Sequence, residues 1–153
     1  DGRRAGTENV AGVLAMVAAL EEREAAIRSG ALEDRLEWRA EFESGFVVAL
    51  PGARVLGAGG ERLWNTVSVV MPEVPDCRRR SVVVMDRLGF AVSTGSACAS
   101  GKEKPSHVLT AMGVPPEDAG RALRFSAGWG TTRKDWRALL DGVKTAAREL
   151  GVR

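Results

Sequence analysis

The stretch from Thr132 to Leu150 constrains the fold most, because it predicts one long helix with a single apolar face. Thr132 and Asp135 have the spacing of a capping box, which predicts where this helix begins. Apolar residues then recur at the three- and four-residue spacing of a helix, at Trp136, Leu139, Leu140, Val143, Ala147 and Leu150. Such a face must be buried against another layer, so this segment predicts a layered domain.

A helical pattern also fills the first third of the chain. Thr7 is expected to cap a helix whose apolar positions are Val10, Val13, Leu14 and Val17. After Ser29-Gly30 the pattern resumes, and it stops at Pro51-Gly52. Its later apolar positions are Phe42, Phe46 and Leu50. We expect two helices here, or one long broken helix.

Short strands are predicted between these helical segments. Residues 54–56, 66–71 and 90–93 are strand candidates, and residues 123–127 alternate between apolar and polar side chains. Residues 81–88 fit either structure, because three consecutive valines favour a strand while Ser81, Met85 and Leu88 keep helical spacing. The fold class we predict is α+β, with a small, largely antiparallel sheet covered by helices.

One thiol among small residues is the strongest candidate for chemistry. From Ser93 to Gly101, every residue except Cys98 is serine, threonine, glycine or alanine, which predicts a loop. No bulky side chain shields the sulfur, and thiol chemistry needs an accessible thiolate. We therefore interpret Cys98 as a reactive cysteine, and Cys77, the other cysteine, as a buried small apolar residue.

Five sequence blocks together resemble the C-terminal part of the cysteine desulfurases, which are pyridoxal-phosphate enzymes of the class-V aminotransferase family. The blocks are R-A-G-T-E-N at 4–9, N-T-V-S at 65–68, S-T-G-S-A-C at 93–98, K-P-S-H-V-L-T-A-M-G at 104–113, and L-R-F-S at 123–126 with G-T-T at 130–132. They occur in the family's order, and S-x-G-S-A-C is distinctive of the desulfurases. The resemblance covers nearly the whole chain.

The resemblance implies a fold and a reaction. The fold is the small C-terminal domain of the fold-type I aminotransferase architecture. The reaction converts L-cysteine to L-alanine and leaves a persulfide on Cys98, for transfer to a sulfur-acceptor or scaffold protein in iron–sulfur cluster or thiocofactor assembly. Cys98 is then the nucleophile, Arg124 binds the substrate carboxylate, and Thr7 reaches the cofactor phosphate of the other subunit in a homodimer.

The same resemblance implies that the cofactor domain is absent from this chain. Lys102, Lys104, Lys134 and Lys144 all lie outside the family's lysine motif, so pyridoxal phosphate is expected only in the complete enzyme, and the chain alone is expected to be an inactive fragment. Residues 1–50 are expected to be a helical segment linking from the absent domain, and residues 51–153 the small α/β domain that carries the cysteine loop. Two segments depart from the family pattern: Trp129 replaces an arginine found in many members, and residues 76–80 replace a more acidic segment.

Composition narrows the remaining classes of function. The 22 Lys and Arg residues against 20 Asp and Glu give a net charge of +2, and their scatter argues against nucleic-acid binding. The one basic cluster, residues 78–80, is interpreted as a solvated face or a helix end. Two cysteines and one histidine predict no metal site. No apolar run approaches the ~20 residues of a membrane span and no signal peptide is visible, which predicts a cytoplasmic protein.

Two alternatives to a desulfurase stay open at this point. One is a non-catalytic module that relays a persulfide through Cys98 without cofactor chemistry. The other is a different class-V enzyme, a transaminase or a selenocysteine lyase, although an ordinary transaminase has no use for Cys98. A lysine-bearing cofactor domain, upstream in the same protein or separately encoded, would decide between the desulfurase and the relay.

Overall fold

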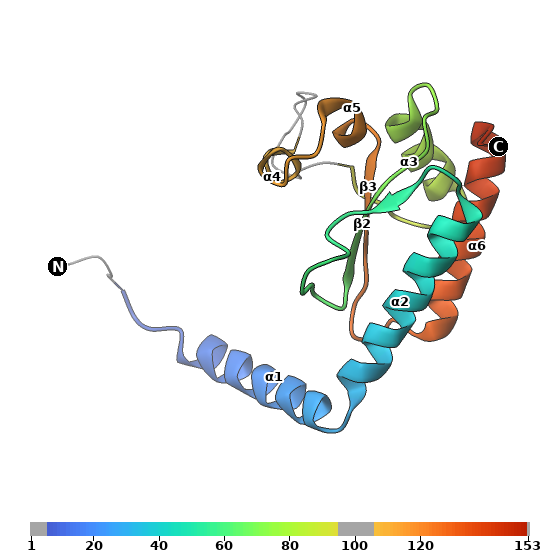
Figure 1. Ribbon diagram of the computed structural model, residues 1–153. Helices are drawn as coiled ribbons and strands as arrows, with labels where there is room; N and C mark the ends of the chain where they lie inside the picture. The colour runs from blue at the N-terminus through green and yellow to red at the C-terminus, as the bar shows by residue number, and fades with distance from the viewer. Residues whose placement is uncertain (1–5, 95–105, 153) are drawn as a thin grey trace. The chain divides into compact units, whose positions relative to one another are not determined.

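The computed structural model describes residues 6–94 and 106–152 of the chain. Six helices and three strands are assigned within these ranges (Figure 1). In chain order they are α1 (Val10–Arg28), α2 (Ala31–Ala49), β1 (Arg54–Val55), β2 (Thr66–Val70), α3 (Cys77–Arg87), α4 (His107–Ala111), α5 (Pro116–Ala119), β3 (Ala122–Ser126) and α6 (Arg133–Leu150). Residues 81–88, which fitted a strand or a helix by sequence, lie almost entirely in helix α3.

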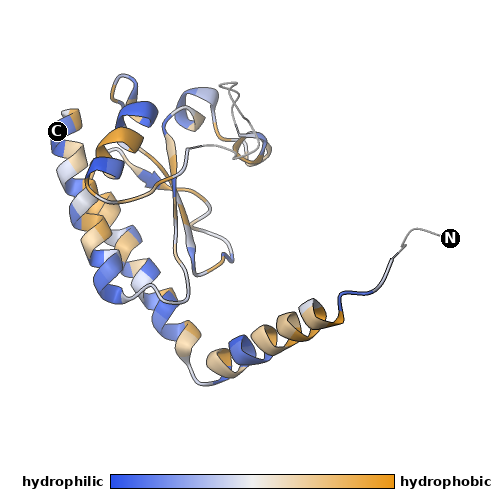
Figure 2. Ribbon diagram, turned by 180° about the vertical axis from the view of Figure 1, so that it is seen from behind, coloured by the Kyte–Doolittle hydropathy of each residue, from blue (hydrophilic) through white to orange (hydrophobic). Residues whose placement is uncertain are grey.

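The chain divides by its internal contacts into two units, and the division falls inside α2, between Asp34 and Arg35. The first unit contains α1, in which no residue is buried. Figure 2 shows that most of this helix is hydrophobic on its visible surface. The domain division predicted at residue 50 stays a prediction, although Phe42 and Phe46 of α2 already belong to the core of the second unit.

The prediction that Thr7 caps the first helix is wrong. The cap is Asn9, whose side-chain oxygen accepts a hydrogen bond from the Gly12 amide at 3.0 Å. Helical geometry begins at Val10, so Asn9 is the residue placed to reach the third amide of the helix. Thr7 lies two residues earlier, exposed and outside any helix.

In the second unit, the sheet has the strand order β1-β2-β3, with both pairs antiparallel. The register pairs Ser68 with Arg124 and Val69 with Leu123, so the polar pair lies on one face of the sheet and the apolar pair on the other. Val67 and Val69 of β2 are fully buried, as their alternation predicted. The prediction of an α+β domain with a small antiparallel sheet is therefore confirmed. The strand predicted at residues 90–93 is reduced to a single bridge, in which Ser93 pairs with Arg124.

The main core lies between one face of the sheet and helices α2, α3 and α6. Phe42 of α2 contacts Trp136 of α6 and Phe125 of β3, with ring centroids 5.0 and 5.4 Å apart. A second, smaller cluster buries the opposite side of the sheet beneath α4 and α5. It consists of Leu56, Val70, Leu109, Ala119 and Ala122. Helices therefore cover both faces, which leaves β3 buried along most of its length.

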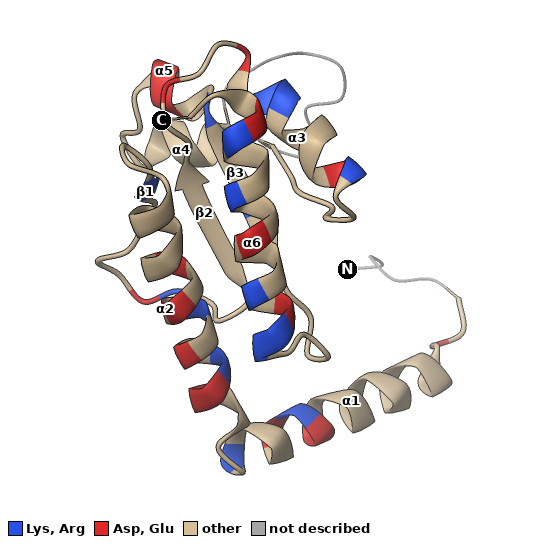
Figure 3. Cartoon of the chain, turned by 90° about the vertical axis from the view of Figure 1, so that its right-hand side faces the viewer, with Lys and Arg blue, Asp and Glu red and all other residues tan. Residues whose placement is uncertain are grey.

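The C-terminal helix α6 forms as its sequence predicted. The Thr132 hydroxyl accepts from the Asp135 amide at 3.3 Å, and the Asp135 carboxylate accepts from the Thr132 amide at 2.8 Å. Gly151 ends the helix with a φ of 80°, a conformation that favours glycine. Acidic and basic residues are interspersed on α2 and α6 (Figure 3), and Arg133 donates from Nε to Glu41 at 2.8 Å. This pair joins α6 to α2.

Trp129, one of the two departures from the family pattern, belongs to an aromatic cluster around Arg35. The Arg35 guanidinium lies 4.3 Å from the centre of the Trp129 ring and donates to the Trp129 carbonyl at 2.7 Å. The Trp64 ring centre lies 5.1 Å from that of Trp129. This cluster ties α2 to the segments that precede β2 and follow β3.

Candidate functional site

Arg124 is held by strand pairing on both sides. Its position in β3 is opposite Ser68 of β2. On the other edge, the Arg124 amide donates to the Ser93 carbonyl at 2.8 Å, and the Ser93 amide donates to the Arg124 carbonyl at 3.1 Å. Leu123 and Phe125 on either side point into the main core, so the Arg124 side chain lies on the opposite face, as its alternation predicted.

A cavity of about 400 Å³, which we call the β3 cavity, opens beside Arg124. Its lining combines the Arg124 guanidinium with three hydroxyl side chains and an apolar remainder, namely Thr66, Ser68, Ser106, Val108, Leu109, Ala122 and Leu123. Arg124 is half-buried, and within the described residues it forms no ion pair. A guanidinium and hydroxyls in a partly apolar pocket suit a small molecule that carries a carboxylate.

Cys98 lies outside the described residues, so its position as a reactive cysteine stays a prediction. The described residues nearest to it in sequence are nevertheless informative. Ser93 is bonded to Arg124, and Ser106 lines the β3 cavity. Ser93 and Ser106, which precede and follow Cys98 in the sequence, are thus both neighbours of Arg124 or of its cavity.

Thr7 is in the first unit and is exposed, with no structural role as a cap. Its predicted contact with a cofactor phosphate stays a prediction. The described residues do not by themselves form a site for pyridoxal phosphate, which requires a lysine for its imine bond. Lys134 is exposed in the first turn of α6, and Lys144 pairs with Asp141 at 3.1 Å. Neither lysine lines the β3 cavity.

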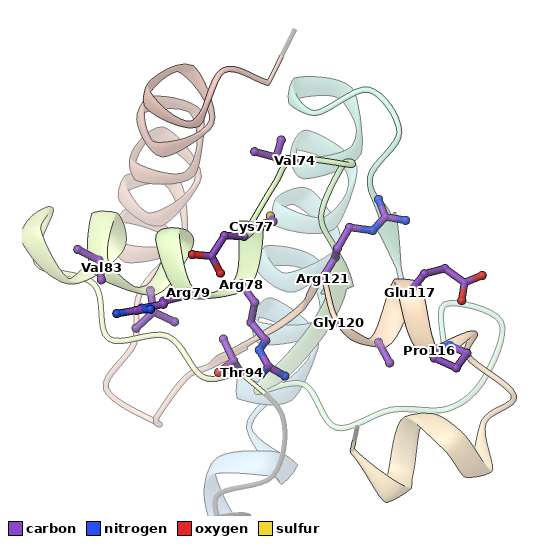
Figure 4. Close-up of a pocket in the computed structure, with 13 residues that line it drawn as sticks. Val74, Cys77, Arg78, Arg79, Val83, Thr94, Pro116, Glu117, Gly120 and Arg121 are labelled. Carbon is purple, nitrogen blue, oxygen red and sulfur yellow. The ribbon is translucent and has the colours of Figure 1, made fainter. Parts of the chain in front are cut away.

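A larger cavity, of about 660 Å³, lies between α3 and α5 and was not predicted from the sequence. We call it the α3 cavity. Its lining is Val74, Asp76, Cys77, Arg78, Arg79, Val82, Val83, Thr94, Pro116, Glu117, Ala119, Gly120 and Arg121, and Figure 4 shows most of these side chains. The basic run at 78–80 was the only sequence signal for it, and a solvated face explained that run equally well.

Cys77 is buried in the wall of the α3 cavity, as predicted, with 3% of its surface exposed. Burial raises the pKa of its thiol above the ordinary value, although a contact of 3.6 Å with the Ser81 hydroxyl and the charges of Arg121 and Arg80 act in the opposite direction. A thiol with a raised pKa is a poor nucleophile near neutral pH. Cys77 therefore does not compete with Cys98 as the candidate nucleophile.

None of the helices in the described part of the chain is both long enough and apolar enough to cross a membrane. This includes α1, whose apolar stretch is followed by the charged run from Glu21 to Arg28.

Comparison with known proteins gives consistent results. The family described as aminotransferase class-V matches residues 1–139. A cysteine desulfurase of Cereibacter sphaeroides is 40% identical over 92% of this chain and 35% of its own length, and a cysteine desulfurase of Enterobacter agglomerans is 37% identical over 82% of this chain and 30% of its own length. A NifS-like protein from Rickettsia africae superposes with a TM-score of 0.77 at 25% identity, over 95% of this chain and 36% of that structure. The chain thus spans about a third of the length of the relatives that it matches.

Proposed function

Because the chain belongs to the class-V aminotransferase family, we propose that it forms the C-terminal part of a cysteine desulfurase. Curated relatives named cysteine desulfurase match most of the chain, in agreement with the resemblance of the five sequence blocks. In the whole protein, L-cysteine is converted to L-alanine while its sulfur is left as a persulfide on Cys98.

The observation that carries this proposal is the pairing of Ser93 with Arg124. An arginine in a small cavity binds the carboxylate of an amino acid, and the paired strand residue leads to the cysteine within a few positions. Five residues of fully extended chain span at most about 18 Å, so Cys98 is within that distance of Ser93. This bound is consistent with our proposal that Arg124 and Cys98 act on one small substrate.

Arg124 has the role of orienting the substrate. Its planar guanidinium can donate to both carboxylate oxygens of L-cysteine, which fixes the direction in which the rest of the molecule extends. The hydroxyls of Thr66 and Ser68 line the same cavity and can donate to further polar atoms of the substrate.

Cys98 has the role of accepting the sulfur. Its thiolate attacks the sulfur of L-cysteine, a new S–S bond forms, and the C–S bond of the substrate breaks as its carbon is protonated to the methyl group of alanine. Pyridoxal phosphate supplies the electron sink for reactions of this kind. In our proposal its site belongs to the part of the protein outside this chain.

The remaining features of the proposal follow from the family. The complete enzyme is a cytoplasmic homodimer that binds pyridoxal phosphate, in which Thr7 reaches the cofactor phosphate of the other subunit. It passes sulfur from Cys98 to an acceptor or scaffold protein for iron–sulfur cluster or thiocofactor assembly. It does not act on membranes or nucleic acids.

A persulfide relay through Cys98 is the second candidate, because a thiolate can accept and pass on sulfur by exchange without a cofactor. The two candidates differ in what they produce from L-cysteine. A desulfurase forms one molecule of L-alanine for each sulfur atom that it transfers. A relay forms no L-alanine, because it only accepts sulfur from another persulfide.

The test maps the persulfide in the full-length protein. After incubation with L-cysteine and alkylation, mass spectrometry should find the persulfide on Cys98 and not on Cys77, and Cys98→Ser should abolish it. Cys77→Ser is the matched control and should leave the modification of Cys98 in place. A persulfide confined to Cys77, or undiminished sulfide release by Cys98→Ser without added reductant, would overturn the assignment.

A further inference from the structure

The α3 cavity combines positive charge with apolar walls, and no step of the proposed reaction uses it. Arg78 and Arg79 come from the first turn of α3, while Pro116 and Glu117 come from α5 on the other side. In Figure 4, the Arg78 side chain extends toward Thr94. Among the residues that the structure describes, neither Arg78 nor Arg79 forms an ion pair. The positive charge of this wall is therefore available to a partner.

The other arginine of the lining, Arg121, is already engaged. It donates to the Met71 carbonyl at 2.9 Å and to Asp118, which also accepts from Arg54. The hydrogen bond from Arg54, together with that from Arg121, holds the pKa of Asp118 below its ordinary range, so this carboxylate stays charged as the pH falls. Figure 4 shows the Arg121 side chain directed away from Arg78. Arg121 is held by these contacts in the wall of the cavity, whereas Arg78 and Arg79 carry charges with which no described residue forms an ion pair.

The first turn of α3 is electrostatically unusual. The start of a helix carries partial positive charge and favours acidic side chains, yet α3 has no acidic residue in its first turn and has three arginines there. Figure 3 shows these basic residues at the beginning of the helix. The Asp76 side chain makes no capping hydrogen bond. An incoming carboxylate would relieve this repulsion.

The local excess of charge is modest, and it favours a protein partner over a nucleic acid. The lining contains three arginines (78, 79 and 121) and two carboxylates (Asp76 and Glu117), which leaves an excess of one positive charge. A nucleic acid needs an extended track of cations, which two neighbouring arginines do not provide. A peptide can place a few carboxylates against the arginines and apolar side chains against Val74, Val82 and Val83.

We propose that the α3 cavity is the docking surface for an acidic segment of the protein that accepts sulfur from Cys98. This inference rests on the proposed desulfurase function. Thr94, which lines the cavity, immediately follows Ser93 of the Ser93–Arg124 bridge, so the docking surface adjoins the β3 cavity. A partner held here presents its own thiolate to the terminal sulfur of the Cys98 persulfide. A new S–S bond forms on the partner, the S–S bond at Cys98 breaks, and Cys98 leaves as a thiolate.

The first test measures binding to the full-length protein. The probe is a short fluorescein-labelled peptide of alternating glutamate and leucine, and its anisotropy is titrated with the parent protein and with the double variant Arg78→Glu/Arg79→Glu. We expect affinity to fall about tenfold or more, because two charge-assisted contacts are replaced by repulsion. Since the double variant also changes net charge, Lys134→Glu serves as a control on an exposed residue outside the cavity and should change affinity by less than about twofold.

Two further probes separate the alternatives. A glutamine–leucine peptide should bind at least about tenfold more weakly than the glutamate–leucine peptide. Equal binding of the two peptides, or an equal loss of affinity in the Lys134→Glu control, would overturn the proposal. Tighter binding of a short single-stranded RNA than of the acidic peptide would also overturn it, in favour of a nucleic-acid surface.

The second test separates this inference from the proposed function. Full-length protein is first loaded with L-cysteine, and the persulfide already on Cys98 is then offered to short peptides that carry one cysteine among glutamates or among lysines. We expect faster transfer to the acidic peptide, and a loss of that preference in Arg78→Glu/Arg79→Glu. If no persulfide forms on Cys98, the desulfurase proposal fails. If it forms but passes equally fast to both peptides, only the docking surface fails.

Discussion

The β3 cavity and the α3 cavity both use arginine, but they place it in different surroundings. Arg124 is half-buried on a strand that is paired on both sides and shares a pocket of about 400 Å³ with hydroxyl side chains. Arg78 is half-buried and Arg79 is exposed at the start of a helix, and both line a cavity of about 660 Å³ that also contains carboxylates.

This difference determines what each arginine can do. A guanidinium fixed by its backbone and partly removed from water gives a strong, directional contact to one small carboxylate. An exposed guanidinium gives a weaker contact that water and salt screen, and it contributes more to attracting a partner than to holding it. The two cavities are therefore suited to a substrate and to a protein, respectively.

The largest expected effect concerns Arg124. In the complete enzyme, Arg124→Ala should lower kcat/KM for L-cysteine by ~10²-fold or more, because a charge-assisted hydrogen bond contributes about 1.5 to 3 kcal/mol and a bidentate pair somewhat more. Arg124→Lys should recover little, since an ammonium lacks the planar fork. Thermal stability should stay near that of the parent, because the strand pairing uses only the Arg124 backbone. Unchanged kinetics, or activity lost only through unfolding, would make Arg124 a structural residue and remove the contrast between the cavities.

The second largest expected effect is that of salt, which should weaken peptide binding at the α3 cavity more than cysteine binding at the β3 cavity. When ionic strength rises from about 0.1 M to about 1 M, the Debye length falls from ~10 Å to ~3 Å. Binding of the acidic probe peptide at Arg78 and Arg79 should then weaken several-fold in anisotropy titrations, whereas KM for L-cysteine should change by less than about twofold. A urea denaturation control in the same buffers shows whether the fold itself responds. An equal salt dependence at both cavities would show that the burial of Arg124 has no consequence for binding.

The smallest expected effect concerns Cys77 in the wall of the α3 cavity. Burial raises the pKa of its thiol, so the folded protein holds this proton more tightly than the unfolded chain does. The resulting stability is fully present below the unfolded pKa and is lost as pH rises through the folded pKa. Tm should therefore fall more steeply in the alkaline range for the parent than for Cys77→Ala, as followed by circular dichroism. Parallel Tm curves would indicate that burial does not raise the pKa of the Cys77 thiol.

Sequence patterns predicted the structure best where neighbouring residues decide it. Helix α6 forms as predicted from its capping box and apolar spacing, and the alternation in β2 gives the predicted buried valines. The prediction failed at Thr7, because a polar residue near a helix start does not show which residue takes the cap. At residues 81–88 the β-branched side chains and the helical spacing disagreed, and tertiary packing of Ser81 and Met85 selected the helix.

The two cavities also differ in how much of each could be predicted from neighbouring residues in the sequence. The five sequence blocks indicate the family, and alternation with Leu123 and Phe125 is enough to predict that Arg124 lies on the face opposite the core. The basic run at 78–80 is equally visible in the sequence, but nothing in it distinguishes a solvated helix end from the wall of a cavity. That distinction depends on α5 and Thr94, which lie 14 or more residues further along the chain.

The sequence by itself therefore determined the local elements, the residue types available for chemistry and the family. Spacing and capping are properties of residues a few positions apart, so they can be read along the chain. Tertiary structure alone decided that Ser93 pairs with Arg124, that Ser106 lines the same cavity, and that Arg78 and Arg79 face α5 without an ion pair among the described residues. These neighbours come from distant segments, and only the pairing of strands and the packing of helices on the sheet bring them together.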